Sequence, residues 1–331
     1  MTTAWWHSLR IDRPPVPGET SDEAALRHVL ARLGEYAELI VRPLNMRPTS
    51  AALIDATTAR IRVRVGNPTA NVMLVIAPVG DLAGEAFFLR ALVRRGLQAP
   101  QLLDQDLTCA VVPFSYLITS YTAGVRLSQV EDTAHIRLAA RQIGRQLRQV
   151  HQVPAPAFGR PLATGRWPGL PWHDTLARWL HENGCRARLE AVLDPSLLAR
   201  LLAVTLEHPE LHHEQPMVIH GALEPATALV SVSDTVALEA IIEPGAIIGG
   251  DPFFDLALAL TPSRPAAFRQ GLLEGYLSFG ALPSNRGGVC AACNCCSPPP
   301  IWHVPANPPR SNVCRANWQQ HSRRLHDASM V

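Results

Sequence analysis

The segment of residues 59–78 most constrains the fold, because it predicts an antiparallel sheet with one buried face. Two strand-like runs, ARIRVRV (Ala59–Val65) and VMLVIAP (Val72–Pro78), flank the turn sequence GNPTAN. Side chains in the first run alternate between arginine and aliphatic residues, so one face of this strand is apolar and the other basic. The arginines are Arg60, Arg62 and Arg64.

The first half of the chain contains further strand patterns and two helical patterns. Apolar residues at helical spacing predict an N-terminal helix over Thr20–Ala37, and a second helix fits Gly84–Arg95. Runs rich in apolar and β-branched residues predict strands at Ala51–Ile54, Thr108–Val112 and Tyr116–Ser120. We therefore expect a strand-rich first lobe.

The second half is mainly helical. One apolar face runs through Ile136–Val150, prolines then interrupt the pattern, and helices fit His173–Asn183 and Pro195–Glu207. A β-rich lobe followed by an α-rich lobe defines an α+β fold.

Composition excludes several classes of protein. Of 331 residues, 47% are hydrophobic and 18% charged, as in a globular protein, and a net charge of +2 argues against a broad nucleic-acid-binding face. The start of the chain lacks a signal-peptide pattern, and the longest uncharged run, Leu107–Val125, is broken by Pro113 and Gly124. Isolated Cys109 and Cys185 fit reduced thiols. We therefore expect a cytoplasmic protein without a membrane partner.

The last segment, residues 284–331, has a different composition. It lacks helical or strand periodicity and is rich in Pro, Cys, Asn and Arg, which predicts a disordered or out-of-frame tail. The alternative is a zinc site, which is a weak motif because Cys290 and Cys293 have no second Cys-x-x-Cys pair beside them. Other candidate ligands are Cys295, Cys296, His303 and Cys314 in the tail, and His208, His212 and His213 in EHPELHHE, for which a plain loop is the favoured interpretation.

Three segments in the second half occur in a distinctive order. They are HGALEPAT (His220–Thr227), AIIEPG (Ala240–Gly245) and GDPFFDLALAL (Gly250–Leu260). In this order and spacing they resemble the aminoglycoside phosphotransferase family, which comprises choline-kinase-like small-molecule kinases of protein-kinase-like fold. The resemblance covers about residues 38–280 and implies a bilobal fold.

Upstream segments extend the resemblance. GEAFFLRAL (Gly84–Leu92) is similar to the helix whose glutamate, here Glu85, pairs with a phosphate-binding lysine. LITSYTAGVRL (Leu117–Leu127) resembles the hinge, so Ser120 and Tyr121 are implied to contact nucleotide. The implied organisation is an N-terminal extension (1–37), a β-rich lobe (38–121), an α-rich lobe (122–283) and the tail (284–331).

The departures from the family pattern fall on its reactive positions. The implied catalytic aspartate corresponds to Ala222, and the metal-binding asparagine and aspartate correspond to Thr227 and Glu243. Val75 occupies the lysine position, and the chain contains no lysine at all. The turn DATTA lacks the glycines expected over the phosphates. The framework positions remain: His220, Gly221, Gly250, Asp251, Pro252 and Asp255.

Some residues offer substitutes for the lost groups. Arg62 or Arg64 could bind a nucleotide phosphate from the strand beside Val75, but a solvated strand face is the favoured interpretation. Glu243 retains a carboxylate for Mg²⁺. Glu224 is either a displaced base or an exposed loop carboxylate, and the latter is favoured because its position differs from that of the reactive side chain.

These observations predict a kinase scaffold with degraded catalytic residues. Loss of a general base alone lowers a rate by roughly 10²–10⁴-fold. We therefore expect a pseudokinase-like binder of a nucleotide or small molecule between the lobes, with ATP and Mg²⁺ bound weakly or not at all. The alternatives are an active small-molecule kinase with non-standard residues and a non-catalytic interaction protein. Neither the substrate nor the oligomeric state follows from the sequence.

Overall fold

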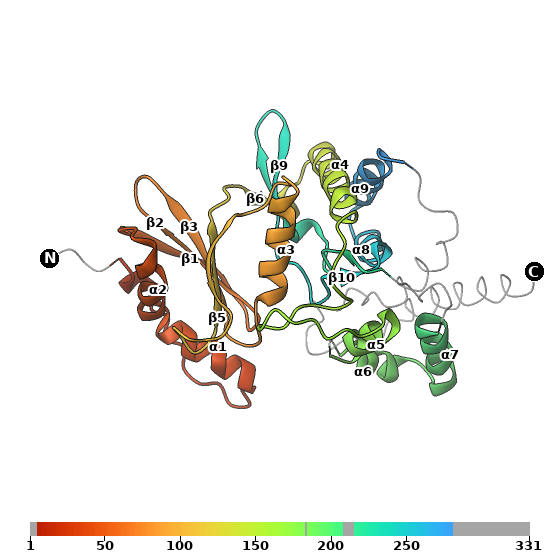
Figure 1. Ribbon diagram of the computed structural model, residues 1–331, viewed down its shortest axis with the longest axis horizontal. Coiled ribbons are helices and arrows are strands. Elements are labelled where there is room, and N and C mark those ends of the chain that lie inside the picture. The colour runs from red at the N-terminus through yellow and green to blue at the C-terminus, as the bar shows by residue number, and fades with distance from the viewer. Residues whose placement is uncertain (1–4, 183, 208–214, 281–331) are drawn as a thin grey trace, which may run out of the picture. The chain divides into compact units, whose positions relative to one another are not determined.

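A five-stranded antiparallel sheet forms the first lobe of the computed structural model, which describes residues 5–182, 184–207 and 215–280 (Figure 1). The strand order is β1-β2-β3-β5-β4, so the predicted hairpin of β2 and β3 lies inside the sheet. The strands are β1 (Ser50–Ala56), β2 (Ile61–Gly66), β3 (Asn71–Ala77), β4 (Leu102–Asp106) and β5 (Ser115–Ser120).

Helices cover the two faces of this sheet (Figure 1). The apolar residues of β2 pack against α1 (Ser21–Ala31) and α2 (Leu33–Val41), while α3 (Ala83–Arg94) covers the opposite face. The single helix predicted near the N-terminus is therefore two helices, because the backbone leaves helical geometry at Arg32, with φ −119° and ψ 14°.

The strand predicted over Thr108–Val112 is wrong. The strand lies earlier, at β4, and the Asp106 carboxylate at its end accepts hydrogen bonds from the backbone N–H groups of Thr108 (2.9 Å) and Val111 (2.8 Å). Cys109 takes a left-handed φ of 60° in the resulting turn. The side-chain oxygen thus satisfies backbone donors that a strand would have used in its ladder.

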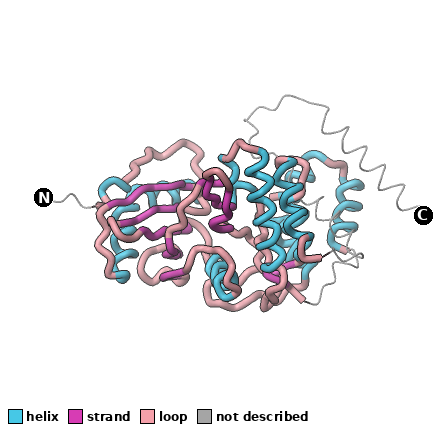
Figure 2. Tube along the Cα trace, turned by 90° about the horizontal axis from the view of Figure 1, so that it is seen from above, coloured by secondary structure: helices cyan, strands magenta, loops and turns pink. Residues whose placement is uncertain are grey.

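The second lobe consists of helices and two small sheets, which Figure 2 separates by colour. The sheets have the orders β6-β8-β9 and β10-β7. Helix α6 was not predicted from the sequence. The elements are β6 (Val125–Arg126), α4 (Thr133–Val150), α5 (Trp172–Glu182), α6 (Cys185–Val192), α7 (Pro195–Leu206), β7 (Met217–Val218), β8 (Ala228–Val232), β9 (Val236–Ile241), β10 (Gly249–Gly250), α8 (Pro252–Ala259) and α9 (Ala266–Leu277).

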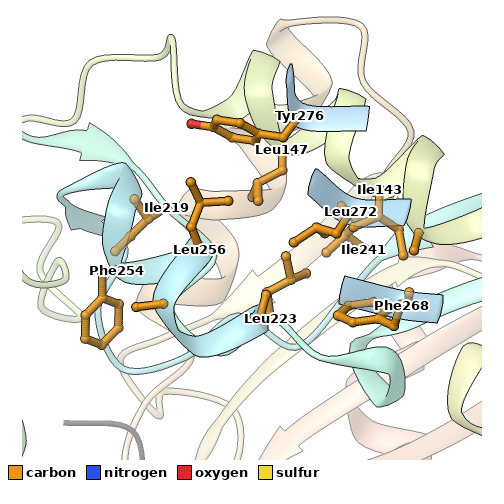
Figure 3. Packing of buried hydrophobic residues seen from close by; sticks show 14 of the residues in the cluster. Ile143, Leu147, Ile219, Leu223, Ile241, Phe254, Leu256, Phe268, Leu272 and Tyr276 are labelled. Atoms are coloured by element: carbon orange, nitrogen blue, oxygen red, sulfur yellow. The ribbon is translucent and has the colours of Figure 1, made fainter. Parts of the chain in front are cut away.

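The core of the second lobe lies between α4, α8 and α9 (Figure 3). Ile143 and Leu147 of α4 meet Leu272 and Tyr276 of α9, and all four are at most 2% exposed. Leu223, from the loop after β7, packs into the same core and so attaches that loop to the helices. Among the described residues, no helix has the length and apolar character needed to span a membrane.

The domain boundaries remain predictions. The five-stranded sheet lies within residues 38–121, but α2 (Leu33–Val41) crosses the expected boundary at 37/38. The tail with its candidate zinc ligands and the three histidines of residues 208–213 lie outside the described residues.

Candidate functional site

The loop after β7 carries Ala222, which lies beside Gly245 of the loop after β9. Gly221 has φ +75°, and a Cβ there would lie 2.1 Å from the Ile247 carbonyl oxygen, so this position requires glycine. The Gly245 N–H donates to the His220 carbonyl (2.8 Å), which holds residues 243–245 beside Ala222. A methyl group therefore stands at the tip of a tightly defined turn.

A buried carboxylate anchors this turn. Asp255 on α8 accepts hydrogen bonds from the backbone N–H groups of His220 and Gly221, each 2.6 Å long. Its Oδ2 also lies 3.0 Å from Nε2 of His151, whose Nδ1 lies 2.9 Å from the Tyr276 hydroxyl. Burial alone would raise the pKa of Asp255, but the hydrogen bonds from His151 and His220 hold it below its ordinary value.

His220 is fully buried. Its Nε2 lies 3.0 Å from the Ile242 carbonyl, and its ring meets Phe88 of α3 edge-on at 5.4 Å. Burial lowers the pKa of His220, although Asp255 opposes the shift, so the imidazole stays neutral with Nε2 as donor. The ring therefore has a packing and hydrogen-bonding role between the lobes.

The buried His220 predicts a stability loss in mild acid. Its pKa is depressed in the fold, so the unfolded chain binds a proton first as the pH falls below about 6.5. The contribution of His220 to the free energy of unfolding is thus complete above about pH 6.5. It is lost as the pH falls toward the lower pKa of the folded state, by at most about 1.4 kcal/mol per pH unit. Unfolding free energies measured from pH 8 to pH 5 should fall more for the wild type than for His220→Gln. The exposed-site control His28→Gln should keep the wild-type slope; parallel curves for wild type and His220→Gln would contradict this assignment.

Arginines and carboxylates from both lobes form a second feature, the arginine cluster, defined as Arg62, Arg126, Asp55 and Glu243. Arg62 and Arg126 both form ion pairs with Glu243 Oε1, at 2.7 Å for Arg126. The same two guanidinium groups reach Asp55 Oδ2 at 3.4 and 3.1 Å respectively. The cluster joins β1 and β2 to β6 and to the loop after β9.

Local backbone geometry assembles this cluster. A bulge at Ile54 shifts the register between Leu53 and Asp55, which places Asp55 opposite Arg62 on the neighbouring strand. Arg62 in turn lies opposite Val75, so a guanidinium group stands one strand away from the implied lysine position. Glu243 has a left-handed φ of 61°, a backbone state that packing must impose on a non-glycine residue.

Burial changes the electrostatics of this cluster. Arg62 is only 8% exposed, so the interpretation of a solvated strand face is wrong for this residue. Burial alone would raise the pKa of Glu243, but Arg62 and Arg126 outweigh it and lower that pKa. Glu243 is thus an ionised carboxylate that two cations already neutralise.

Glu85, the glutamate expected to pair with a lysine, pairs with an arginine instead. Glu85 of α3 pairs with Arg60 at 2.8 Å, and Arg60 also donates to the Pro244 carbonyl at 3.1 Å. Arg60 therefore connects α3 to the loop that carries Glu243. A cation thus still contacts this glutamate. It is Arg60, the residue before β2, and not a lysine on β3 at the position of Val75.

Other expected site residues lie apart from the cluster. The Thr227 hydroxyl donates to the Glu224 carbonyl (2.9 Å) and accepts from the Glu224 N–H (3.2 Å), within its own turn. The Glu224 carboxylate pairs with Arg264. Arg64 lies over the Tyr121 ring at 5.8 Å, and the Ser120 hydroxyl accepts from the Gln101 N–H at 2.9 Å. Gly250 and Asp251 precede α8, where Asp251 accepts from the Phe253 N–H at 2.9 Å and caps the helix.

Asp55, Arg60 and Arg126 were not expected from the sequence to be site residues. All three lie in segments named above: the turn DATTA, the arginine strand and the hinge. The one available signal was that these charged residues flank the implied nucleotide region. Their ion-pair partners could not be inferred, because those partners lie far away in the sequence.

The chain belongs to the phosphotransferase enzyme family, whose profile (APH) matches residues 54–287. Among solved structures, a thermostable mutant of aminoglycoside phosphotransferase APH(4)-Ia is similar, with a TM-score of 0.58 and 13% identity over 78% of this chain and 87% of that one. Macrolide 2′-phosphotransferase MphH from Brachybacterium faecium has a TM-score of 0.55 and 18% identity, covering 77% and 86%. These likenesses confirm the kinase-like α+β fold expected from the sequence. A search of curated protein sequences finds no match.

Proposed function

We propose that this protein binds a nucleotide between its lobes and has lost efficient phosphoryl transfer. The observation that carries the proposal is the replacement of the reactive groups: Ala222 presents a methyl group, and Glu243 is paired with Arg62 and Arg126. Phosphoryl transfer depends on positioning and on metal and cation electrostatics, so these changes remove its main contributions together. The intact anchor of the turn at Asp255 supports a scaffold that still holds its binding geometry.

Ligands in the structures of similar proteins support a nucleotide as the class of ligand. One structure of APH(4)-Ia is a ternary complex with ADP and hygromycin B, and one of APH(2″)-IIIa is a complex with GDP and kanamycin. We extend the nucleotide, and a small hydroxyl-bearing molecule beside it, to this chain. Free Cys109 and Cys185 support our further proposal that the protein works in the reducing cytoplasm.

Two measurements test this function. Titration calorimetry with ADP and ATP should detect nucleotide binding, and transfer of the ATP γ-phosphate to a panel of aminoglycosides and small alcohols should stay below about 10⁻³ per second, against about 1–100 per second for typical kinases. Turnover at a typical kinase rate would establish the active-kinase alternative. Failure to bind either nucleotide would instead favour a non-catalytic interaction protein.

A further inference from the structure

The arginine cluster has no net charge in the absence of a metal ion. Two guanidinium groups face two carboxylates, so the charges of Arg62, Arg126, Asp55 and Glu243 sum to zero. The cluster is also accessible from solvent, because the side chains of Asp55, Arg126 and Glu243 are 31%, 24% and 21% exposed. A ligand can therefore reach Arg126 and the two carboxylates, while the side chain of Arg62 is only 10% exposed.

The residues present do not fit a magnesium ion. Mg²⁺ requires oxygen ligands in octahedral geometry, but Oε1 of Glu243 is already paired with two guanidinium groups. A divalent cation would have to approach that oxygen past two positive charges. The Thr227 hydroxyl is engaged in its own turn, and the described residues contain no group of three or more His, Cys, Asp or Glu side chains suited to a metal.

Arg62 keeps an unused donor. Its Nε is buried and has no hydrogen-bond partner within the described part of the chain, although its Nη2 is paired. A buried donor without an acceptor is destabilising, and a phosphate oxygen that displaces the Glu243 carboxylate would supply the acceptor. Guanidinium groups bind phosphate through parallel N–H···O bonds, which an ammonium group cannot reproduce.

We propose that Arg62 and Arg126 take the place of the divalent cation in this protein, so that a nucleoside di- or triphosphate binds through its phosphates without magnesium and in competition with the Glu243 carboxylate. This inference rests on the proposed nucleotide-binding function and deepens it. Glu243 then has a role opposite to that of a metal ligand, because it occupies the cations that the phosphates need.

Calorimetric titration with ADP, in EDTA and in excess Mg²⁺, tests the metal dependence. The dissociation constant in EDTA should be equal to or lower than that in Mg²⁺. A Kd that improves tenfold or more with Mg²⁺ would overturn the inference while leaving nucleotide binding, and thus the proposed function, intact. Absence of ADP binding in both buffers would overturn the inference and the proposed function together.

Substitutions test the competition between Glu243 and the phosphates. Removal of a carboxylate should raise ADP affinity, and removal of a guanidinium group should lower it. Glu243→Gln keeps the shape but removes a negative charge, so ADP affinity in EDTA should rise about tenfold, since a hydrogen bond to a charged group contributes about that factor. If Glu243→Gln does not fold, Asp55→Asn removes the other carboxylate and should act in the same direction. Arg126→Gln should weaken ADP binding tenfold or more. A metal-ligand role for Glu243 predicts weaker binding of Mg-ADP in Glu243→Gln, and that result would contradict the proposal.

Matched controls come from outside the cluster. Glu239→Gln on β9 changes the same functional group where the carboxylate accepts from Ser231, and Arg186→Ala removes an exposed arginine that pairs with Glu190. Both should leave the ADP dissociation constant unchanged within twofold. Equal gains in Glu239→Gln and Glu243→Gln would assign the effect to overall charge and would overturn the proposal.

Discussion

Asp255→Asn is expected to lower the free energy of unfolding by about 3–5 kcal/mol, because it breaks a buried charged network. The carboxylate accepts from Gly221 through Oδ1 and from His220 and His151 through Oδ2. An amide has one acceptor oxygen and one NH₂ group. Whichever way it is oriented, the NH₂ faces an N–H donor, and at least one buried donor loses its partner.

Urea unfolding and hydrogen exchange together measure this effect. The exchange of the backbone amides of residues 220–221 should accelerate in Asp255→Asn, because these amides lose their acceptor. Asp234→Asn, in the exposed turn between β8 and β9, is the matched control and should change stability by less than about 0.5 kcal/mol. A loss below 1 kcal/mol in Asp255→Asn, with unchanged exchange, would show that the network does not anchor the turn.

Those parts of the site that depend on backbone geometry were predictable from the sequence. Gly221 is needed because its φ is positive, and Asp251 caps α8 through its side chain, so each residue type reflects a local requirement. The strand alternation in β2 likewise predicted one apolar face, and Ile61, Val63 and Val65 are fully buried. Local requirements of this kind leave a signature in the residue types themselves.

The arginine cluster was not predictable in the same way. Arg126 lies 71 residues from Asp55 and 117 from Glu243 in the sequence, so the fold alone brings them together. The bulge that places Asp55 opposite Arg62 contains no glycine or proline, so the residue types did not indicate it. The residue types suggested Arg62 as a phosphate ligand and Glu243 as a metal ligand, but their mutual ion pair follows only from the fold.

The ion pairs of Glu85 and Glu243 bear on what a single substitution at residue 222 can do. Arg60 pairs with Glu85, and Arg62 and Arg126 pair with Glu243, so these charges are balanced without a bound ligand. An aspartate introduced at residue 222 would leave these ion pairs as they are. We therefore expect Ala222→Asp alone to leave γ-phosphate transfer at background.

Gly144→Ala is expected to destabilise the second lobe by about 3 kcal/mol, although a helix intrinsically prefers alanine to glycine. Propensity alone would favour alanine by about 1 kcal/mol at this position in α4. A Cβ at residue 144, however, would lie 2.1 Å from the Leu272 carbonyl oxygen and 2.7 Å from the Tyr276 nitrogen. Both are backbone atoms, so α9 would have to move as a unit, and the contacts of Ile143 and Leu147 with it would loosen.

The sign of the change separates packing from propensity. Gly84→Ala, in α3, is the matched control, because its Cβ would meet side-chain atoms and no backbone atom: Ile248 at 3.2 Å and Arg160 Cβ at 3.7 Å. A small shift of the Ile248 side chain accommodates it. Unfolding in urea should therefore show a large loss for Gly144→Ala and a change within about 1 kcal/mol for Gly84→Ala. Stabilisation by both substitutions would mean that α4 and α9 do not approach as closely as the structure places them. The helical pattern of residues 136–150 predicted the buried face of α4, but only the distance to a helix more than 120 residues away explains why a glycine stands in that face.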